Sequence, residues 1–414
     1  MSKRVVITGL GTVNALAGSA SEFWPKLLAG ETGIAKIQAF DTSEFKAQIA
    51  GEVKNFDLAG WGVDKKETKR MARFIQFAVA ASWEAARDSG FDIKADSENV
   101  GVIVSSGIGG MEIIEEAQKT LFEKGPAKIS PFVVPMMIAD SASGSVSIQT
   151  GARGVNIAVV TACASGTHSI GEAFEWIKRG QARAVLAGGA EACITPVSLG
   201  GFCAARALCF DSNDTPQKAC RPFDATRSGF VMGEGAGVVF LEELESALAR
   251  GAKIYAEMAG YGATGDAYHI TSPAPGGEGA ARAVKMALRE AGLKPEDIDY
   301  INAHGTSTEL NDKFEAQAIA GIFGADTKVN ISSTKGALGH CLGAAGGLEA
   351  VILAKSVETD QLPPTLNYQT PDPNFPRLNF TPNKSVQRTV RAAMSNSFGF
   401  GGHNAVIVFK KFQK

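Results

Sequence analysis

Short apolar runs rich in β-branched residues alternate with helical stretches along the whole chain, and this alternation restricts the fold more than any other sequence feature. In the first part we expect buried strands at 5–8, 100–104, 157–160, 184–187 and 238–241. In the second part we expect strands at 256–261, 300–303, 328–332, 392–396 and 405–409. Helices are predicted at 70–89, 166–179, 279–291, 314–323 and 343–357. This pattern predicts an α/β fold with layered, largely buried mixed sheets.

The two parts of the chain also resemble each other. An Asn-Ile pair at 156–157 opens a strand that leads to Cys163 and a Gly/Ala-rich helix. The same pair at 330–331 leads to Lys335, His340 and a second helix of that composition. We therefore predict two pseudo-repeated βαβ-type halves, 1–250 and 251–414, with buried central helices whose starts meet near a pseudo-twofold axis.

Composition excludes several classes of protein. The chain has 41 basic and 43 acidic residues, a formal charge of −2, so no whole-chain signature indicates nucleic-acid binding. Six cysteines without C-x-x-C spacing and five scattered histidines favour neither a disulfide scaffold nor a zinc site. No run reaches the ~18–20 apolar residues of a membrane span. We expect a cytoplasmic protein with no membrane or nucleic-acid partner.

One cysteine lies where a strand meets a helix. The run ACASG at 162–166 follows a predicted strand and opens a long predicted helix. At such an elbow the helix dipole and free backbone N–H groups favour a thiolate. The amide of Cys163 can also face an oxygen anion that forms on an attacked thioester. The other five cysteines lack this setting and are assigned to packing.

Two histidines lie at glycine-lined strand ends. NAHGTST at 302–308 places His304 in a small, polar turn, and GH at 339–340 places His340 just before the run GAAGG. Lys335 lies between the second strand and His340. A lone histidine is usually structural, but two such histidines together with Cys163 indicate a catalytic constellation. The remaining three histidines are assigned to packing or to no role.

These motifs resemble those of the β-ketoacyl-[acyl-carrier-protein] synthases, the condensing enzymes of fatty acid synthesis. The match consists of TACASG at 161–166, HGTST at 304–308 with ND at 311–312, Lys335 with GH at 339–340, and SFGFGGHN at 397–404. It extends over almost the whole chain. The ND pair, the length, GF at 201–202 and RAL at 206–208 look most like the type II synthases. The resemblance implies a thiolase-like fold.

The resemblance also implies a decarboxylating condensation. Cys163 would take an acyl chain from acyl carrier protein, and malonyl carrier protein would then lose carbon dioxide. The resulting enolate would attack the Cys163 thioester and give an elongated β-ketoacyl product. Backbone N–H groups of Cys163 and Phe400 would hold the acyl oxygen, and neutral His304 and His340 would hold the malonyl thioester oxygen.

Supporting roles follow from the same resemblance. Lys335 would set the local field and orient His304, paired with Glu349, while the glycine-flanked Phe400 would act as a gate. The remaining substrate contacts would be Thr306 and Thr308 for the phosphopantetheine arm and Ile108 and Phe202 for the acyl pocket. No redox or organic cofactor and no catalytic metal are expected. The resemblance adds a structural monovalent cation near Asn302, Glu349, Ser395 and Asn396.

Two protein partners are implied, acyl carrier protein and a second copy of the chain in a homodimer. A basic run at 65–73, broken only by Glu67, predicts a helix start with Lys65, Lys69 and Arg73 on one face. Because the carrier protein is acidic, we expect Lys65, Lys69 and Arg206 to dock it.

Some features depart from the family pattern or fit other proteins. Glu309 stands where the family often has proline, and ADSAS at 139–143 replaces a commoner Asn-Met-x-x-Gly-type run. A thiolase is disfavoured by His340 and by the Phe400 loop. A polyketide chain-length factor would lack the nucleophile Cys163, whereas a polyketide-type ketosynthase stays an alternative. A Rossmann dehydrogenase would need Gly-x-Gly-x-x-Gly, which the N-terminal strand loop does not supply.

Overall fold

The fold is described from a computed structural model that covers residues 2–413. Within those residues, one mixed sheet has the strand order β10-β9-β13-β14-β8-β1-β7-β5-β4. Its strands are β1 (Val5–Asn14), β4 (Val100–Ser105), β5 (Ala184–Glu191), β7 (Gly235–Glu243), β8 (Ala256–Gly265), β9 (Tyr300–Asn302), β10 (Asn330–Ser332), β13 (Ala392–Gly399) and β14 (His403–Lys410). The short strands β2 (Ala35–Lys36), β3 (Ile49–Gly51) and β6 (Met232–Gly233) form a second sheet, and β11 (Gln361–Leu362) pairs with β12 (Val386–Gln387).

The large sheet consists of two halves with the same topology. In one half β1 pairs with β7 antiparallel, β7 with β5 antiparallel, and β5 with β4 parallel. The other half has the same three pairings: β8 pairs with β14 antiparallel, β14 with β13 antiparallel, and β13 with β9 parallel. The parallel pair β9–β10 corresponds to a single parallel bridge between Val102 and Asn156. The predicted pseudo-repeat is therefore confirmed, while the division of the chain at residue 250 stays a prediction.

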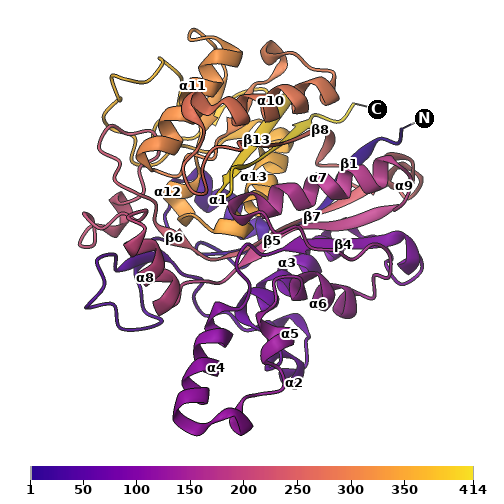
Figure 1. The fold of residues 1–414 in the computed structure, drawn as a ribbon. Helices are drawn as coiled ribbons and strands as arrows, with labels where there is room; N and C mark the ends of the chain where they lie inside the picture. Colours follow the sequence, from indigo (N-terminus) through magenta and orange to yellow (C-terminus); the bar gives the residue numbers. More distant parts are fainter. Residues whose placement is uncertain (1, 414) are drawn as a thin grey trace.

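Helices form three layers around the two half-sheets. The central layer holds α7 (Ser165–Lys178) and α13 (Ala345–Thr359), and α13 contacts strands of both halves. The outer layers hold α3 (Arg73–Ser89) with α6 (Ser141–Thr150) on one side and α10 (Glu278–Ala291) with α11 (Glu309–Phe323) on the other. Figure 1 shows this order from bottom to top. The layered α/β fold predicted from the alternation is confirmed.

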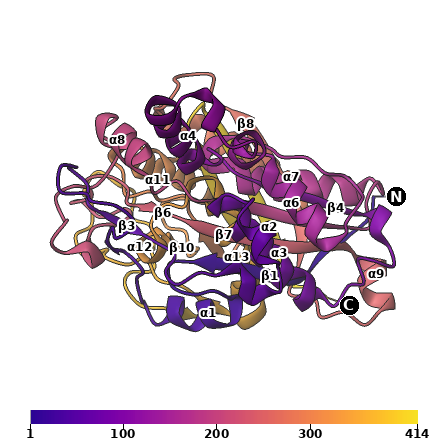
Figure 2. The same ribbon diagram turned by 90° about the horizontal axis from the view of Figure 1, so that it is seen from below.

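The remaining helices lie around this core. They are α1 (Ala20–Leu28), α2 (Lys65–Thr68), α4 (Met111–Lys124), α5 (Val133–Met137), α8 (Pro196–Ala204), α9 (Leu244–Ala249) and α12 (Lys335–Leu338). Helices α2, α4 and α5 project together below the sheet in Figure 1, and Figure 2 shows α1 on the side opposite α4 and α8. Among the described residues, no helix is both long and apolar enough to cross a membrane.

Glycines allow the two central helices to start side by side. A Cβ atom on Gly166 would lie 2.8 Å from the backbone nitrogen of Gly347, and one on Gly346 would lie 2.1 Å from Thr167 Oγ1. Real Cβ atoms do not approach other atoms this closely, so only glycine fits at these positions. The packing brings the start of α7, which follows Cys163, against the start of α13, which follows His340.

Two local predictions are wrong. Residues 157–160 do not form a strand, and Ile157 and Val160 are 39% and 53% exposed at the sheet edge, because no further strand among residues 2–413 covers them. The basic run at 65–73 is not one helix either. Helix α2 ends at Thr68, the backbone at Ala72 is extended, and Arg73 turns inward to pair with Glu234 at 2.7 Å.

Candidate active site

Cys163 lies in a tight turn directly before α7, as the sequence predicts. The turn is the short 3-10 segment Ala162–Ala164, and Ala162 adopts the left-handed region at φ 50°. The Ser165 side chain stabilises this turn, because its hydroxyl donates to the Ala162 carbonyl at 2.7 Å and accepts from the Thr161 N–H at 2.9 Å. The elbow therefore presents the sulfur at a fixed position at the start of the helix.

Burial decides the charge of this cysteine. Loss of solvent raises the pKa of the Cys163 thiol to about 12, and Lys335 is the strongest influence that acts against this rise. Burial therefore acts against the thiolate that the helix start was expected to favour. The helix dipole acts only over the first turn, whereas desolvation of a charged group inside a protein is a larger effect. The nucleophile rests as a neutral thiol.

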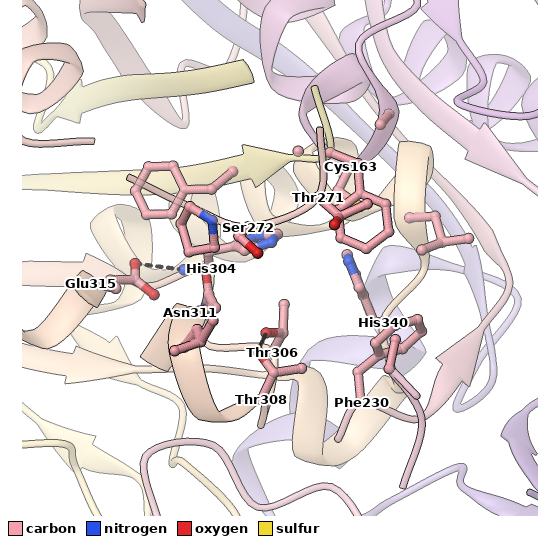
Figure 3. Close-up of a pocket in the computed structure, with 18 of the residues that line it drawn as sticks. Cys163, Phe230, Thr271, Ser272, His304, Thr306, Thr308, Asn311, Glu315 and His340 are labelled. Carbon is pink, nitrogen blue, oxygen red and sulfur yellow. Dashed lines mark hydrogen bonds between the residues drawn. The ribbon is translucent and has the colours of Figure 1, made fainter. Parts of the chain in front are cut away.

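His304 and His340 face the same space as Cys163 (Figure 3). Their ring centroids are 5.2 Å apart and their planes are nearly perpendicular, at 84°. Burial, followed by the charge of Lys335, lowers the pKa of both imidazoles well below the ordinary 6.5. Both rings are therefore neutral near pH 7, the form that can donate a single N–H to a developing oxygen anion.

Glu315 on α11 positions His304 from behind. Its two carboxylate oxygens accept the backbone N–H groups of His304 and Gly305, each at 2.8 Å (Figure 3). Burial raises the pKa of Glu315 to about 7. The sequence analysis missed this residue, although a carboxylate on the helix that follows the histidine turn was a usable signal. Phe230, packed edge-on against His340 at 5.3 Å, was also missed and has no motif around it.

Lys335 acts through its charge and not by lining the cavity. Its ammonium pairs with the Glu349 carboxylate on α13 at 2.5 Å, and both side chains are almost fully buried. The pairing expected between these two residues is present. Lys335 nevertheless influences the titration of Cys163, His304 and His340 together.

The Phe400 loop closes one side of the site. Gly401 and Gly402 have φ values of 89° and 74°, which favour glycine, and a Cβ on Gly399 would lie 2.6 Å from the Thr161 carbonyl oxygen. Hydrogen bonding to the Phe400 backbone acts to lower the pKa of the Cys163 thiol, against the effect of burial, and the Phe400 ring is 40% exposed. The loop thus borders Cys163 and places a large ring at the opening.

A cavity of about 490 Å³ connects these groups. Nine residues singled out in the sequence line it, namely Cys163, His304, His340, Phe400, Ile108, Phe202, Thr306, Thr308 and Arg206. One wall is apolar, because Ile108 and Phe202 pack with Cys163, Phe230 and Leu342. The hydroxyls of Thr306 and Thr308 lie 2.8 Å apart on the other side. The cavity can hold a long apolar chain with a polar arm beside it.

A cluster of unpaired oxygens lies behind the site. Among residues 2–413, the buried atoms Asn302 Oδ1, Ser395 Oγ and Asn396 Oδ1 have no hydrogen-bond partner. Buried polar atoms without a partner are uncommon and call for an explanation. Hard, neutral oxygen donors that are buried and unpaired fit the monovalent cation that the resemblance implies.

The residues expected to dock a carrier protein lie on the surface. Lys65 on α2, the nearby Lys69 and Arg206 are all exposed, and only Arg206 borders the cavity. Arg206 has a positive φ of 55°, in the turn after α8. The predicted helical alignment of Lys65 and Lys69 with Arg73 is absent, because the helix is broken between them.

Comparisons with known proteins identify the family. The description "Beta-ketoacyl synthase, N-terminal domain" matches residues 2–247, and "Beta-ketoacyl synthase, C-terminal domain" matches residues 255–369. The chain belongs to the beta-ketoacyl synthase family. Members of this family are acyltransferase-type condensing enzymes, so the family and enzyme class predicted from the motifs are confirmed.

Individual relatives agree with this assignment. The chain is 51% identical to the 3-oxoacyl-[acyl-carrier-protein] synthase 2 of Staphylococcus aureus, over 100% of this chain and 99% of the relative. A beta-ketoacyl synthase from Burkholderia phymatum STM815 superposes with a TM-score of 0.92 at 37% identity, over 99% of this chain and 100% of that chain. A type II polyketide ketosynthase solved with its acyl carrier protein gives a TM-score of 0.92 at 34% identity, over 100% of both chains.

The neutral state of the two histidines can be tested by titration. Because their pKa values are lowered, His304 and His340 should stay neutral as the pH falls from 8 to 6 and become charged only at lower pH. NMR of protein labelled at histidine carbons, assigned with single His→Gln variants, follows each ring. A resonance of either ring with a midpoint near 6.5 would contradict the proposed environment.

Proposed function

We propose that this beta-ketoacyl synthase condenses an acyl-[acyl-carrier-protein] with malonyl-[acyl-carrier-protein] in fatty acid elongation. The products are a β-ketoacyl-[acyl-carrier-protein], carbon dioxide and free carrier protein. One observation carries the proposal, namely that Cys163, His304, His340 and Phe400 line one cavity. Relatives that carry the 3-oxoacyl synthase 2 name at 51% identity support the fatty acid pathway over a polyketide role.

The first half-reaction transfers the acyl chain to the protein. The Cys163 sulfur attacks the thioester carbon, and the pantetheine sulfur leaves with the proton that the thiol gives up. During the attack the carbonyl oxygen gains negative charge. The N–H groups of Cys163 and Phe400 stabilise this charge, because fixed backbone donors need no reorganisation. The apolar wall with Ile108 and Phe202 receives the acyl chain.

The second half-reaction forms the new carbon–carbon bond. Malonyl thioester enters beside Thr306 and Thr308. The bond between its carboxylate carbon and its methylene carbon breaks, carbon dioxide leaves, and the electron pair of that bond forms the enolate. Neutral His304 and His340 donate to the enolate oxygen. The enolate carbon then attacks the Cys163 thioester, and the cysteine sulfur leaves and regains a proton.

Lys335 and Phe400 support both steps in this proposal. Burial lowers the pKa of both histidines, and the positive charge of Lys335, held by Glu349, reinforces that effect and helps to keep them neutral. Phe400 gates the cavity, since its ring is partly exposed between glycines that allow large backbone rotations. The order of the two half-reactions would then depend on movement of this loop.

No redox or organic cofactor takes part in the proposed reaction. A bound monovalent cation would be held by Asn302, Glu349, Ser395 and Asn396, of which three offer unpaired buried oxygens. Its contribution would be structural, since it would give those oxygens a partner and fix the strand ends that carry His304 and Phe400. A reducing, cytoplasmic location is part of the same proposal, because all six cysteines are free in the described residues.

The division of labour can be tested with single variants. We expect Cys163→Ala to lose acyl transfer and condensation and still release labelled carbon dioxide from malonyl carrier protein. His304→Ala and His340→Ala should still become acylated, which mass spectrometry detects, while decarboxylation falls roughly 100- to 1,000-fold. Near-normal decarboxylation in a folded histidine variant would show that its assigned role is wrong.

Docking of the acidic carrier protein can be tested by charge reversal. Replacing Lys65, Lys69 and Arg206 with Glu should raise KM for carrier-protein substrates about tenfold and weaken the salt dependence of the rate. Activity on free pantetheine thioesters should barely change, because those substrates lack the acidic surface. Equal losses on both substrate classes would contradict docking.

A matched control uses exposed lysines away from the cavity. Lys94, Lys285 and Lys384 are exposed and do not line it. Their triple replacement by Glu changes the net charge by the same amount as the docking variant. If KM rises equally in both triple variants, the effect comes from overall charge and not from a local surface.

We also propose that two copies of the chain form a homodimer through the edge at 157–160. Ile157 and Val160 are exposed there, and the nearby Ile148 is 79% exposed. An exposed apolar edge pairs readily with a second copy about a twofold axis. Ile157→Glu with Val160→Lys should convert a dimer to a monomer in analytical ultracentrifugation. A wild-type monomer at micromolar concentration would refute this assembly.

A further inference from the structure

A buried carboxylate outside the Cys-His-His set lies at the end of strand β5. Glu191 is fully buried, and it borders the active-site cavity. Its Oε1 accepts the hydroxyl of Ser106 at 2.5 Å and the N–H of Ile108 at 3.3 Å. Its Oε2 accepts the N–H groups of Gly107 and Gly343, each at 3.0 Å. Four donors therefore converge on one carboxylate.

These donors come from both halves of the fold. Ser106, Gly107 and Ile108 follow strand β4 in the first half, whereas Gly343 belongs to the second half, three residues after His340. Among the described residues, Glu191 forms no ion pair with a basic side chain. A buried carboxylate without a cation needs hydrogen bonds on both oxygens, so the two loops and Glu191 are held as one unit.

The loop that Glu191 holds also forms part of the apolar wall. Ile108 packs with Cys163, Phe202 and Leu342. The neighbouring Gly107 has little freedom, since a Cβ there would lie 3.0 Å from the Ala162 carbonyl oxygen. The bond to the Ile108 N–H is the longest of the four, and therefore the one that breaks most easily when an acyl chain presses on the wall.

We propose that Glu191 is a positioning residue that holds Ile108 in the cavity wall and thereby restricts the entry of long acyl chains. The inference rests on the proposed function, because it assigns the apolar wall to the acyl chain. It adds a specificity determinant that touches neither the nucleophile nor the malonyl group. The same carboxylate joins the wall to the segment after His340, so both substrate sites share one support.

The chemistry of glutamine allows a selective test. In Glu191→Gln the amide oxygen can stay at the Oε2 position and keep the bonds to Gly107 and Gly343. The amide nitrogen then replaces Oε1 and donates to the Ser106 hydroxyl, which can rotate to accept. The N–H of Ile108 would face a second donor, lose Glu191 as an acceptor and keep only the Ser106 Oγ, 3.3 Å away. The variant should therefore loosen Ile108 and leave the Gly343 side in place.

The experiment compares kcat/KM for hexanoyl and myristoyl carrier protein in the wild type and Glu191→Gln, normalised to the concentration of reactive Cys163. We expect the myristoyl-to-hexanoyl ratio to rise about fivefold, the effect of losing one long hydrogen bond. Malonyl decarboxylation should stay within about twofold, because the Gly343 bond is kept. An unchanged ratio in the folded variant would overturn the proposal.

A matched control separates this effect from general loss of stability. Glu84 on α3 is another largely buried carboxylate that accepts backbone N–H groups, those of Thr12 and Ala20, but it does not line the cavity. Glu84→Gln should leave the chain-length ratio unchanged. If Glu84→Gln shifts the ratio as much as Glu191→Gln, the effect is global and the proposal fails.

Two further measurements cover other outcomes. If Glu191→Gln does not fold, Ser106→Ala tests the same loop, since Ser106 also accepts the N–H of Gly109 at 2.8 Å, and the ratio should rise again. If the wild type does not condense acyl and malonyl carrier proteins, the proposed function is wrong.

In that case the positioning of Ile108 is tested by alkylation of Cys163 with long- and short-tailed iodoacetamides. The long-to-short rate ratio should still rise in Glu191→Gln, and an unchanged ratio would overturn the positioning role.

Discussion

The active site depends on the close approach of two buried helices. Helices α7 and α13 start side by side because Gly166 and Gly346 leave no side chain between their backbones. A single Cβ at these positions would meet backbone or side-chain atoms at less than 3 Å, and a close-packed interior has no room to relax. This packing helps to bring Cys163 from one half of the fold and His340 from the other to the same cavity.

Burial at this junction then sets the charges on which the chemistry depends. Desolvation keeps the Cys163 thiol protonated and both histidines neutral, and the ammonium of Lys335 acts on all three groups. Glu349 holds that ammonium in place, so its positive charge stays in the core at a fixed position. The fold thereby supplies neutral N–H donors for oxygen anions without a catalytic metal in the proposed mechanism.

Sequence patterns predicted the local structure of turns and helix starts correctly. They failed where the structure depends on residues far away in the chain. The elbow at Cys163 and the glycine-flanked Phe400 were predictable, because turns and helix starts are set by local backbone preferences. The run at 157–160 reads as a buried strand but lies exposed, since nothing in its own residues says whether another strand covers it. Arg73 was expected on a basic surface, yet its partner Glu234 is 161 residues away in the chain.

The sequence by itself determined the fold class, the pseudo-repeat and the family, because each of these is encoded in local patterns and their spacing, and it predicted Cys163, His304 and His340 as the catalytic residues. Only the tertiary structure decided that Cys163 rests as a thiol, that Glu315 holds His304, and that Glu191 joins the two halves beside the cavity. Those properties arise from desolvation and from hydrogen bonds between segments far apart in the chain. Neither a solvent-excluded volume nor a contact between remote loops exists until the layers have packed.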